Sequence, residues 1–159
     1  MKQPFLLYLL IVLVFFQALS GLAGGFGLTL SPSGESIQMP ISMLENTPFN
    51  NFLIPGLFLL LVLGVFPTLL GYAMLKEPNW NWANKLNVYK KYHFLWAYSL
   101  YLGLILILWI NIEIYMVGGG HILQFIYGIL GTLLIIITLS PQVMNYYEKL
   151  AAKLFKNVK

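Results

Sequence analysis

The sequence contains no cysteine and no arginine, and only 9% of its 159 residues are charged. The absence of cysteine excludes disulfide bonds, thiolate metal sites and cysteine nucleophiles. The absence of arginine removes the forked side chain that proteins usually use for bidentate binding of phosphate or carboxylate groups. Soluble proteins carry about 25% charged residues, so a chain that is 59% hydrophobic is typical of a membrane protein.

The chain also lacks the short motifs that would identify a reaction. It has no H-E-x-x-H zinc motif, no nucleophile elbow and no glycine-rich loop between a strand and a helix. Its run of three glycines, Gly118–Gly120, lies between two apolar runs and indicates a tight turn. These absences favour a protein that is not an enzyme, and we expect no cofactor and no metal ion.

Four apolar runs occupy most of the chain: residues 5–30, 49–75, 94–117 and 122–139. At 1.5 Å per residue, each can cross a hydrocarbon core about 30 Å thick, the fourth only just. The links between the runs are short, which favours antiparallel neighbours. The sequence therefore predicts an all-α polytopic membrane protein, with a four-transmembrane-helix up-down antiparallel bundle over residues 1–141.

Lysine is confined to alternate links of this predicted bundle. The links 31–48 and 118–121 contain none, and all nine lysines lie in the remaining segments: Lys2, Lys76, Lys85, Lys90, Lys91, Lys149, Lys153, Lys156 and Lys159. By the positive-inside rule, these segments and both termini face the cytoplasm of a bacterial cytoplasmic (inner) membrane. Membrane orientation accounts for the net charge of +4, so we expect no nucleic acid partner.

The N-terminal run has two interpretations. Lys2, the apolar stretch after it and residues 18–20 resemble a cleavable leader. The run continues to Leu30 without a polar region, however, and this length favours a retained helix. Within it, Ser20, Gly21, Gly24 and Gly25 form a strip of small residues that predicts close helix packing. Packing against a second copy or a larger membrane protein would use such a strip, although glycine is also common in membrane helices without this role.

The tail, residues 142–159, predicts an amphipathic basic helix. On a helical wheel its apolar residues share one arc, and Lys149, Lys153 and Lys156 lie opposite. Such a helix is expected to lie on the cytoplasmic membrane surface and to bind anionic lipid headgroups. Docking on a partner protein is the alternative, because the wheel does not identify what covers the apolar arc.

One carboxylate, Glu113, lies inside an apolar run, about one helical turn from its end. A charge at the membrane centre costs about 2.5 to 3.5 kcal/mol, and less near an interface. Glu113 is either a structural hydrogen-bonding centre, which we favour, or a proton or ligand site. In the second case His121 and Glu45 are the other catalytic candidates, because a histidine and carboxylates together suit proton transfer.

Four polar or aromatic residues near Glu113 are candidates for a binding role. Trp109 precedes it by one turn, Asn111 and Tyr115 lie on adjoining faces, and Gln124 in the next run is a neutral hydrogen-bond donor. They would either satisfy the carboxylate or contact a ligand beside it.

Several stretches resemble a family of small bacterial four-helix integral membrane proteins without an assigned activity. These are the first helix ending near GG and P-S-G, the segment TPFNNFLIPG, the basic link with its tryptophans, and WINIEI. The family loop has an acidic residue before P-S-G, where this chain has Ser31. The resemblance implies a membrane location and little chemistry.

The leading functional prediction is a non-enzymatic structural, interaction or accessory protein of the membrane. A small intramembrane acid/base enzyme acting on a lipid-like substrate is the first alternative, and a proton-coupled transporter is the second. Against the transporter, the sequence shows no inverted repeat and few polar residues at mid-depth.

Overall fold

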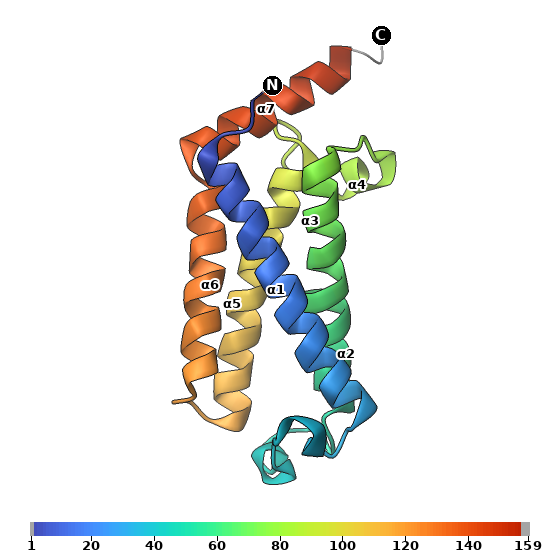
Figure 1. Ribbon diagram of the computed structural model, residues 1–159, viewed down its shortest axis with the longest axis vertical. Helices are drawn as coiled ribbons and strands as arrows, with labels where there is room; N and C mark the ends of the chain where they lie inside the picture. Colours follow the sequence, from blue (N-terminus) through green and yellow to red (C-terminus); the bar gives the residue numbers. More distant parts are fainter. Residues whose placement is uncertain (1, 157–159) are drawn as a thin grey trace.

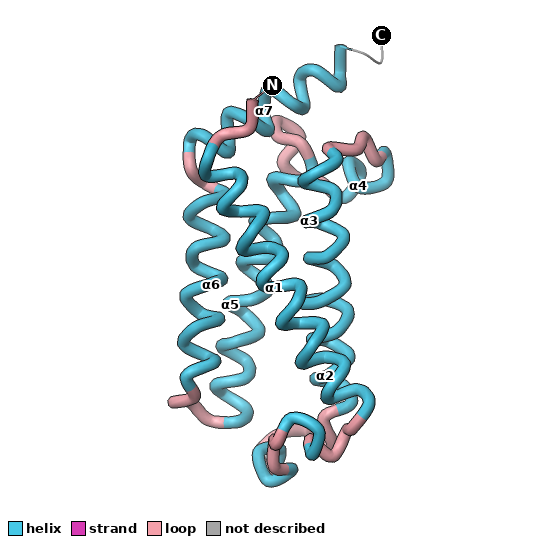
Figure 2. Tube along the Cα trace, in the orientation of Figure 1, coloured by secondary structure: helices cyan, strands magenta, loops and turns pink. Residues whose placement is uncertain are grey.

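The computed structural model describes residues 2–156, with side chains described through Lys153. The regular secondary structure of this part of the chain is all helical, joined by loops and turns, and contains no strand (Figure 2), which confirms the all-α prediction for it. The longer helices are α1 (Phe5–Leu30), α2 (Leu53–Leu60), α3 (Phe66–Lys76), α4 (Asn81–Leu86), α5 (Phe94–Val117), α6 (Ile122–Thr138) and α7 (Pro141–Lys156). The π-helix η3 (Leu61–Val65) joins α2 to α3, and the 3-10 helices η1 (Glu35–Ile37) and η2 (Ile41–Leu44) lie between α1 and α2.

The long helices run alternately along the long axis of the molecule (Figure 1). α1 descends in this view, α2 and α3 return, α5 descends again and α6 returns. We call the end with α4 and α7 the terminal end, and the end with residues 31–52 and 118–121 the loop end. α7 crosses the terminal end and is bent from α6 by 57°.

Three helices are long and apolar enough to cross a membrane: α1, the continuous α2–η3–α3 helix and α5. α6 has 17 residues and passes the same test only together with α7, as one bent span. The described chain therefore has three helices that could cross a membrane, or four with the bent pair. The predicted fourth run, 122–139, corresponds to α6.

The second long helix begins at Leu53, whereas the sequence analysis placed its start at residue 49. Thr47 and Asn51 hold the intervening residues in turns. The Thr47 hydroxyl accepts a hydrogen bond from the Phe49 amide at 3.2 Å, and Asn51 Oδ1 accepts one from the Leu53 amide at 3.0 Å. Local side-chain hydrogen bonds of this kind compete with the helical pattern and delay the start of the helix.

Two glycines of α1 allow it to contact the second long helix through the backbone. A Cβ atom added to Gly21 would lie 1.9 Å from the Leu63 carbonyl oxygen, and one on Gly25 would lie 2.4 Å from the Leu60 amide nitrogen. Only glycine fits at such distances. The glycine strip therefore packs inside the chain, so it no longer supports the predicted contact with a second copy or a larger membrane protein.

Pro67 leaves one backbone carbonyl of the π-helix available for a hydrogen bond from α1. Pro67 has no amide hydrogen, so the Leu63 carbonyl, four residues earlier, lacks its usual helical donor. Gln17, in the middle of α1, is buried, and its Nε2 donates a hydrogen bond to this carbonyl at 3.1 Å. A polar side chain in an apolar helix thus satisfies a backbone group in the neighbouring helix.

The apolar face of α7 packs on the bundle. Val143, Tyr147, Leu150 and Ala151 are buried there, and the Tyr147 carbonyl accepts a hydrogen bond from the His93 amide at 3.2 Å. The predicted amphipathic helix is present, but this part of its apolar face is covered by the chain itself and is not free for lipid. Lys149 and Lys153 are exposed, whereas the Lys156 side chain and residues 157–159 lie outside the described part.

Candidate functional site

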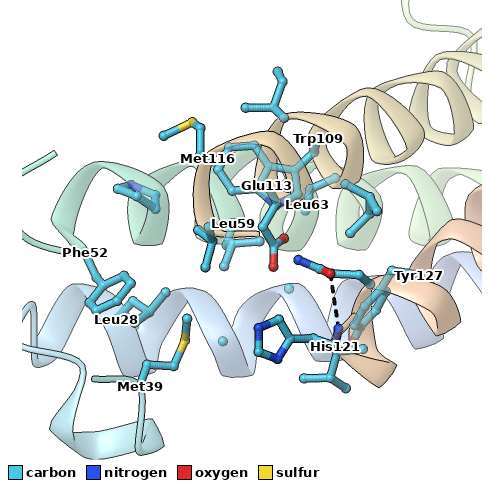
Figure 3. A pocket seen from close by; sticks show the side chains of 18 of the residues that line it. Leu28, Met39, Phe52, Leu59, Leu63, Trp109, Glu113, Met116, His121 and Tyr127 are labelled. Carbon is cyan, nitrogen blue, oxygen red and sulfur yellow. Dashed lines mark hydrogen bonds between the residues drawn. The ribbon is translucent and has the colours of Figure 1, made fainter. Parts of the chain in front are cut away.

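A cavity of about 310 Å³ lies near the loop end, between α1 and the second long helix on one side and α5 and α6 on the other (Figure 3). Its walls are mainly aliphatic and aromatic, with three methionines: Met39 and Met43 from the segment between α1 and α2, and Met116 from α5. Methionine is flexible and polarizable, and it adapts to irregular apolar surfaces. The wall also contains polar side chains, among them the amides of Gln17 and Gln124, the carboxyl group of Glu113 and the imidazole of His121.

The arrangement of the helix pairs accounts for the cavity. α1 packs along α2, η3 and α3, α5 packs along α6, and α3 meets α5 toward the terminal end. The two pairs diverge toward the loop end (Figure 1). Near the loop end the ring of Phe58 stacks on that of Trp109, with centroids 4.3 Å apart, and links the second long helix to α5. The remaining space between the pairs is the cavity.

Glu113 projects from α5 into this cavity (Figure 3). It is partly buried, lies beside the Gln124 side chain and is within electrostatic reach of His121, the residue that precedes α6. The predicted proximity of Glu113, His121 and Gln124 is therefore present in the structure. Among the described residues that line the cavity, Glu113 is the one acidic residue.

Gln124 has a structural task at this site. Its Oε1 accepts a hydrogen bond from the His121 amide at 3.4 Å, and its Nε2 donates one to the Gly118 carbonyl at 3.1 Å. These bonds fix the turn between α5 and α6, in which Gly118 and Gly120 have φ values of 92° and 98°. Glycine adopts such angles without strain. The turn therefore holds His121 at the mouth of the cavity.

Two polar atoms of residues in the cavity wall are buried without a hydrogen-bond partner among the described residues. They are Nε1 of Trp109, a donor, and Oε1 of Gln17, an acceptor. A buried polar group that makes no hydrogen bond costs about 1 to 3 kcal/mol.

Other predicted site residues lie elsewhere. Glu45 is exposed and does not line the cavity, so the structure does not bring it together with Glu113 and His121. It follows η2, and the turn there directs Glu45 to the surface. Tyr115 is 89% exposed, and Asn111 lines a different, open groove between α5 and α6, where its Nδ2 donates to its own helix at the Ile107 carbonyl.

Sequence reasoning missed Gln17 and the role of the small residues beside it. Ser20, Gly21 and Gly24 line the cavity in addition to their place in the glycine strip. The available signal was that Gln17 is the only amide side chain in the apolar run 5–30. A polar residue at that depth generally has a partner or a function.

A second polar cluster lies at the terminal end and was not predicted. Glu77 Oε1 accepts hydrogen bonds from Gln3 Nε2, at 2.9 Å, and from the Tyr146 hydroxyl. His93 is buried nearby, and burial lowers its pKa to about 4, opposed by the charge of Glu77. The Nδ1 atom of His93 accepts from the Leu95 amide at the start of α5. These contacts join separate segments, which indicates a structural role.

The described residues contain no group of three or more His, Cys, Asp or Glu side chains placed to hold a metal ion. Comparison of the chain with protein families, with curated protein sequences and with solved structures finds no match. The family resemblance of segments such as WINIEI therefore stays a prediction, and the function has to be inferred from the cavity.

Proposed function

We propose that this chain is a non-enzymatic membrane protein that crosses the membrane four times and binds an amphipathic, lipid-like molecule in its loop-end cavity. The observation that carries this proposal is the cavity itself, which has mainly apolar walls and one carboxyl group. Ligand sites in proteins commonly combine an apolar lining with a few polar groups.

The cavity is partly open, so the surroundings of the protein can supply what fills it. Water is a poor filling for walls as apolar as these, because a buried water needs several polar partners. An acyl chain or similar apolar group matches the lining better.

The fourth crossing rests on α6 alone. Its 17 residues span about 25 Å, which suits a thin or locally thinned hydrocarbon core. α7 bends away by 57° and carries exposed Lys149 and Lys153, as expected for a helix at a cytoplasmic membrane surface with anionic headgroups. With the lysines at the terminal end, the positive-inside rule places the cavity in the outer half of a bacterial inner membrane.

An acid/base enzyme acting on a lipid-like substrate is the second candidate. The observation that favours it is that Glu113 and His121 line the same cavity. The expected third group, Glu45, is at the surface, and Gln124 is occupied by the α5–α6 turn. Binding requires nothing beyond the contacts described, so we favour binding.

Cavity filling tests the proposal. A Cβ atom on Gly24 would have Leu59 Cδ1, at 3.8 Å, as its only close neighbour, so a side chain there can extend into the cavity without striking backbone. Gly24→Phe should abolish retention of amphiphile during purification in mild detergent, measured by mass spectrometry of lipid extracts. Ala23→Phe, at the adjacent exposed position, is the matched control and should retain the amphiphile as the parent does. Equal retention by the two variants, or none by the parent, would refute the proposal.

A further inference from the structure

The segment between α3 and α5 carries apolar side chains that the described part of the chain leaves uncovered. Trp82 and Leu86 in α4 are 60% and 65% exposed, and Val88, just after the helix, is 76% exposed. The tail helix differs, because residues on the apolar face of α7 are packed on the bundle. Large apolar groups that gather at one exposed place usually mark an interaction surface. α4 therefore indicates a surface for a partner outside the chain.

Contacts with α5 hold α4 in this exposed position. Ala83, on the inner side of α4, is buried, and its carbonyl accepts a hydrogen bond from the Tyr98 hydroxyl at 3.1 Å. Just before the helix, the ring of Trp80 stacks on the buried ring of Phe94, with centroids 5.9 Å apart. Because α5 fixes both the helix and the residue before it, the exposed side chains of α4 have a defined direction.

The exposed arc of α4 has an apolar half and a polar half. At about 100° per residue, Trp82 and Leu86 lie about 40° apart, and so do Asn81 and Lys85. The centres of these two pairs are about 100° apart around the helix, and all four side chains are exposed. Such a division suits a helix at the boundary of a membrane, where one half meets acyl chains and the other meets headgroups and water.

Lysines give this surface a positive charge. Lys85 is exposed, and at the end of α4 the ammonium of Lys90 donates hydrogen bonds to the carbonyls of Asn84 and Lys85, at 2.8 and 3.4 Å. An ammonium has three donors, so Lys90 retains one for another acceptor. Within the described residues, the one ion pair joins Lys91 to Glu148, so neither Lys85 nor Lys90 is neutralised by a carboxylate there. Phosphate groups of anionic lipids are complementary to this charge.

The position of α4 along the molecule fits the surface of a membrane. Figure 1 shows α4 beside the terminal end of α3, to the side of the bundle. Tyr72 and Leu75, in the last turns of α3, are exposed, so apolar surface leads up to this segment. α3 and α5 belong to candidate membrane spans, and α4 lies between the end of one and the start of the other. Tryptophan and tyrosine are enriched at this depth of membrane proteins.

We propose that α4 and the residues up to Lys90 bind anionic phospholipids of the leaflet at the terminal end, with Trp82 and Leu86 beside the acyl chains and Lys85 and Lys90 at the phosphates. This inference rests on the membrane crossing in the proposed function and is independent of the cavity. It adds to the exposed lysines of α7 a segment that enters the membrane with apolar side chains.

Fluorescent probes on single cysteines test the depth of α4 in full-length protein, which has no cysteine of its own. Bimane is attached to Leu86→Cys, to Asn81→Cys and, as a reference, to Leu104→Cys at an exposed position in the middle of α5. The protein is placed in nanodiscs of equal parts dioleoylphosphatidylcholine and dioleoylphosphatidylglycerol. Lipid brominated on its acyl chains should quench the probes at positions 86 and 104, and acrylamide in the water should quench the probe at position 81.

The reference position separates two kinds of failure. Lipid quenching at position 104 but only acrylamide quenching at position 86 would overturn this inference while the membrane crossing stands. Equal lipid quenching at positions 81 and 86 would also overturn it, because the two halves of α4 would not differ. Absence of lipid quenching at position 104 would overturn the membrane crossing and this inference with it.

Bromination of one lipid at a time tests the preference for negative charge. In the same mixture, brominated phosphatidylglycerol should quench the probe at Leu86→Cys about twofold more than brominated phosphatidylcholine does, because lysines near the surface attract anionic lipid. Lys85→Gln should lower this ratio, whereas Lys149→Gln, at a matched exposed lysine of α7, should leave it unchanged. A ratio of one in the parent, or equal effects of the two lysine replacements, would overturn the assignment of anionic lipid to α4.

Discussion

The hydroxyl of Tyr146 in α7 donates a hydrogen bond to the carboxylate of Glu77, just after α3. Gln3, before α1, donates to the same carboxylate oxygen. Because these three residues are far apart in the sequence, one carboxylate joins the chain's first segment, the end of its second long helix and its last helix. Glu77 itself has a positive φ of 50°, so its backbone is held in a conformation that is uncommon outside glycine.

Removal of the Tyr146 hydroxyl should weaken the attachment of α7. We expect Tyr146→Phe to lower the free energy of unfolding in detergent by about 1 to 2 kcal/mol, because a partly buried carboxylate loses a donor. Limited proteolysis should cut α7 faster in this variant. Glu148→Gln is the control: its ion pair with Lys91, at 3.2 Å, is solvent exposed and should contribute below about 1 kcal/mol. Equal losses in the two variants would contradict this account.

His93 should make stability depend on pH. Burial lowers its pKa to about 4 from an ordinary value of 6.5, so between these values the unfolded chain binds a proton that the native chain does not. Its contribution is therefore fully present above pH 6.5 and is lost as the pH falls toward 4. The loss should reach about 3 kcal/mol at most.

The measurement compares thermal unfolding in detergent between pH 7 and pH 4 for the parent and for His93→Asn. Asparagine also caps helix N-termini but does not titrate. We expect a smaller pH dependence in the variant, and the difference between the two curves isolates His93. Parallel curves would show that this histidine is not responsible.

Backbone contact between α1 and η3 should make Gly21 intolerant of any side chain. Gly21→Ala places a methyl group where the Leu63 carbonyl lies, and should cost about 1 to 3 kcal/mol by forcing the helices apart. Gly128→Ala, at a helical position with open space, should leave stability unchanged or raise it. Thermal stability of the two variants in detergent provides the comparison, and tolerance of Gly21→Ala would show that the contact is looser than described.

Orientation is tested with single cysteines in a chain that has none of its own. Ser36→Cys and Gly119→Cys, at the loop end, should react in intact cells with a thiol reagent that does not cross membranes. Asn84→Cys and Lys149→Cys, at the terminal end, should react only after the membrane is opened. Labelling of Asn84→Cys from outside would reverse the proposed orientation.

The positions of the long helices were largely predictable. Apolar runs bounded by Pro4, by His93 and by the glycines after Val117 gave the limits of α1 and α5 as the structure has them. These signals are local, because a proline, a cap or a glycine acts within a turn or two. The start of α2 at Leu53 was not predicted, because hydrogen bonds of Thr47 and Asn51 compete with helix formation over a few residues.

The site was only partly predictable. Glu113, His121 and Gln124 are close together because a short turn connects their helices, and a sequence shows this directly. The packing of the helices into pairs depends on contacts between residues far apart in the chain, such as Gln17 with Leu63, and no periodicity reveals them. The wheel of α7 likewise gave its apolar face but not the surface that covers it.

The π-helix has a consequence for the helical phase of the second span. A π turn accommodates one extra residue, and each residue of an α-helix corresponds to a rotation of about 100°. α2 and α3 are therefore out of phase with each other, so one continuous helix can pack its loop-end half mainly on α1 and its terminal half on both α1 and α5. Deletion of one residue from 61–65 would bring the halves into phase, and a single face could then no longer serve both sets of neighbours. The cavity near the loop end therefore depends on the one extra residue that the π turn accommodates.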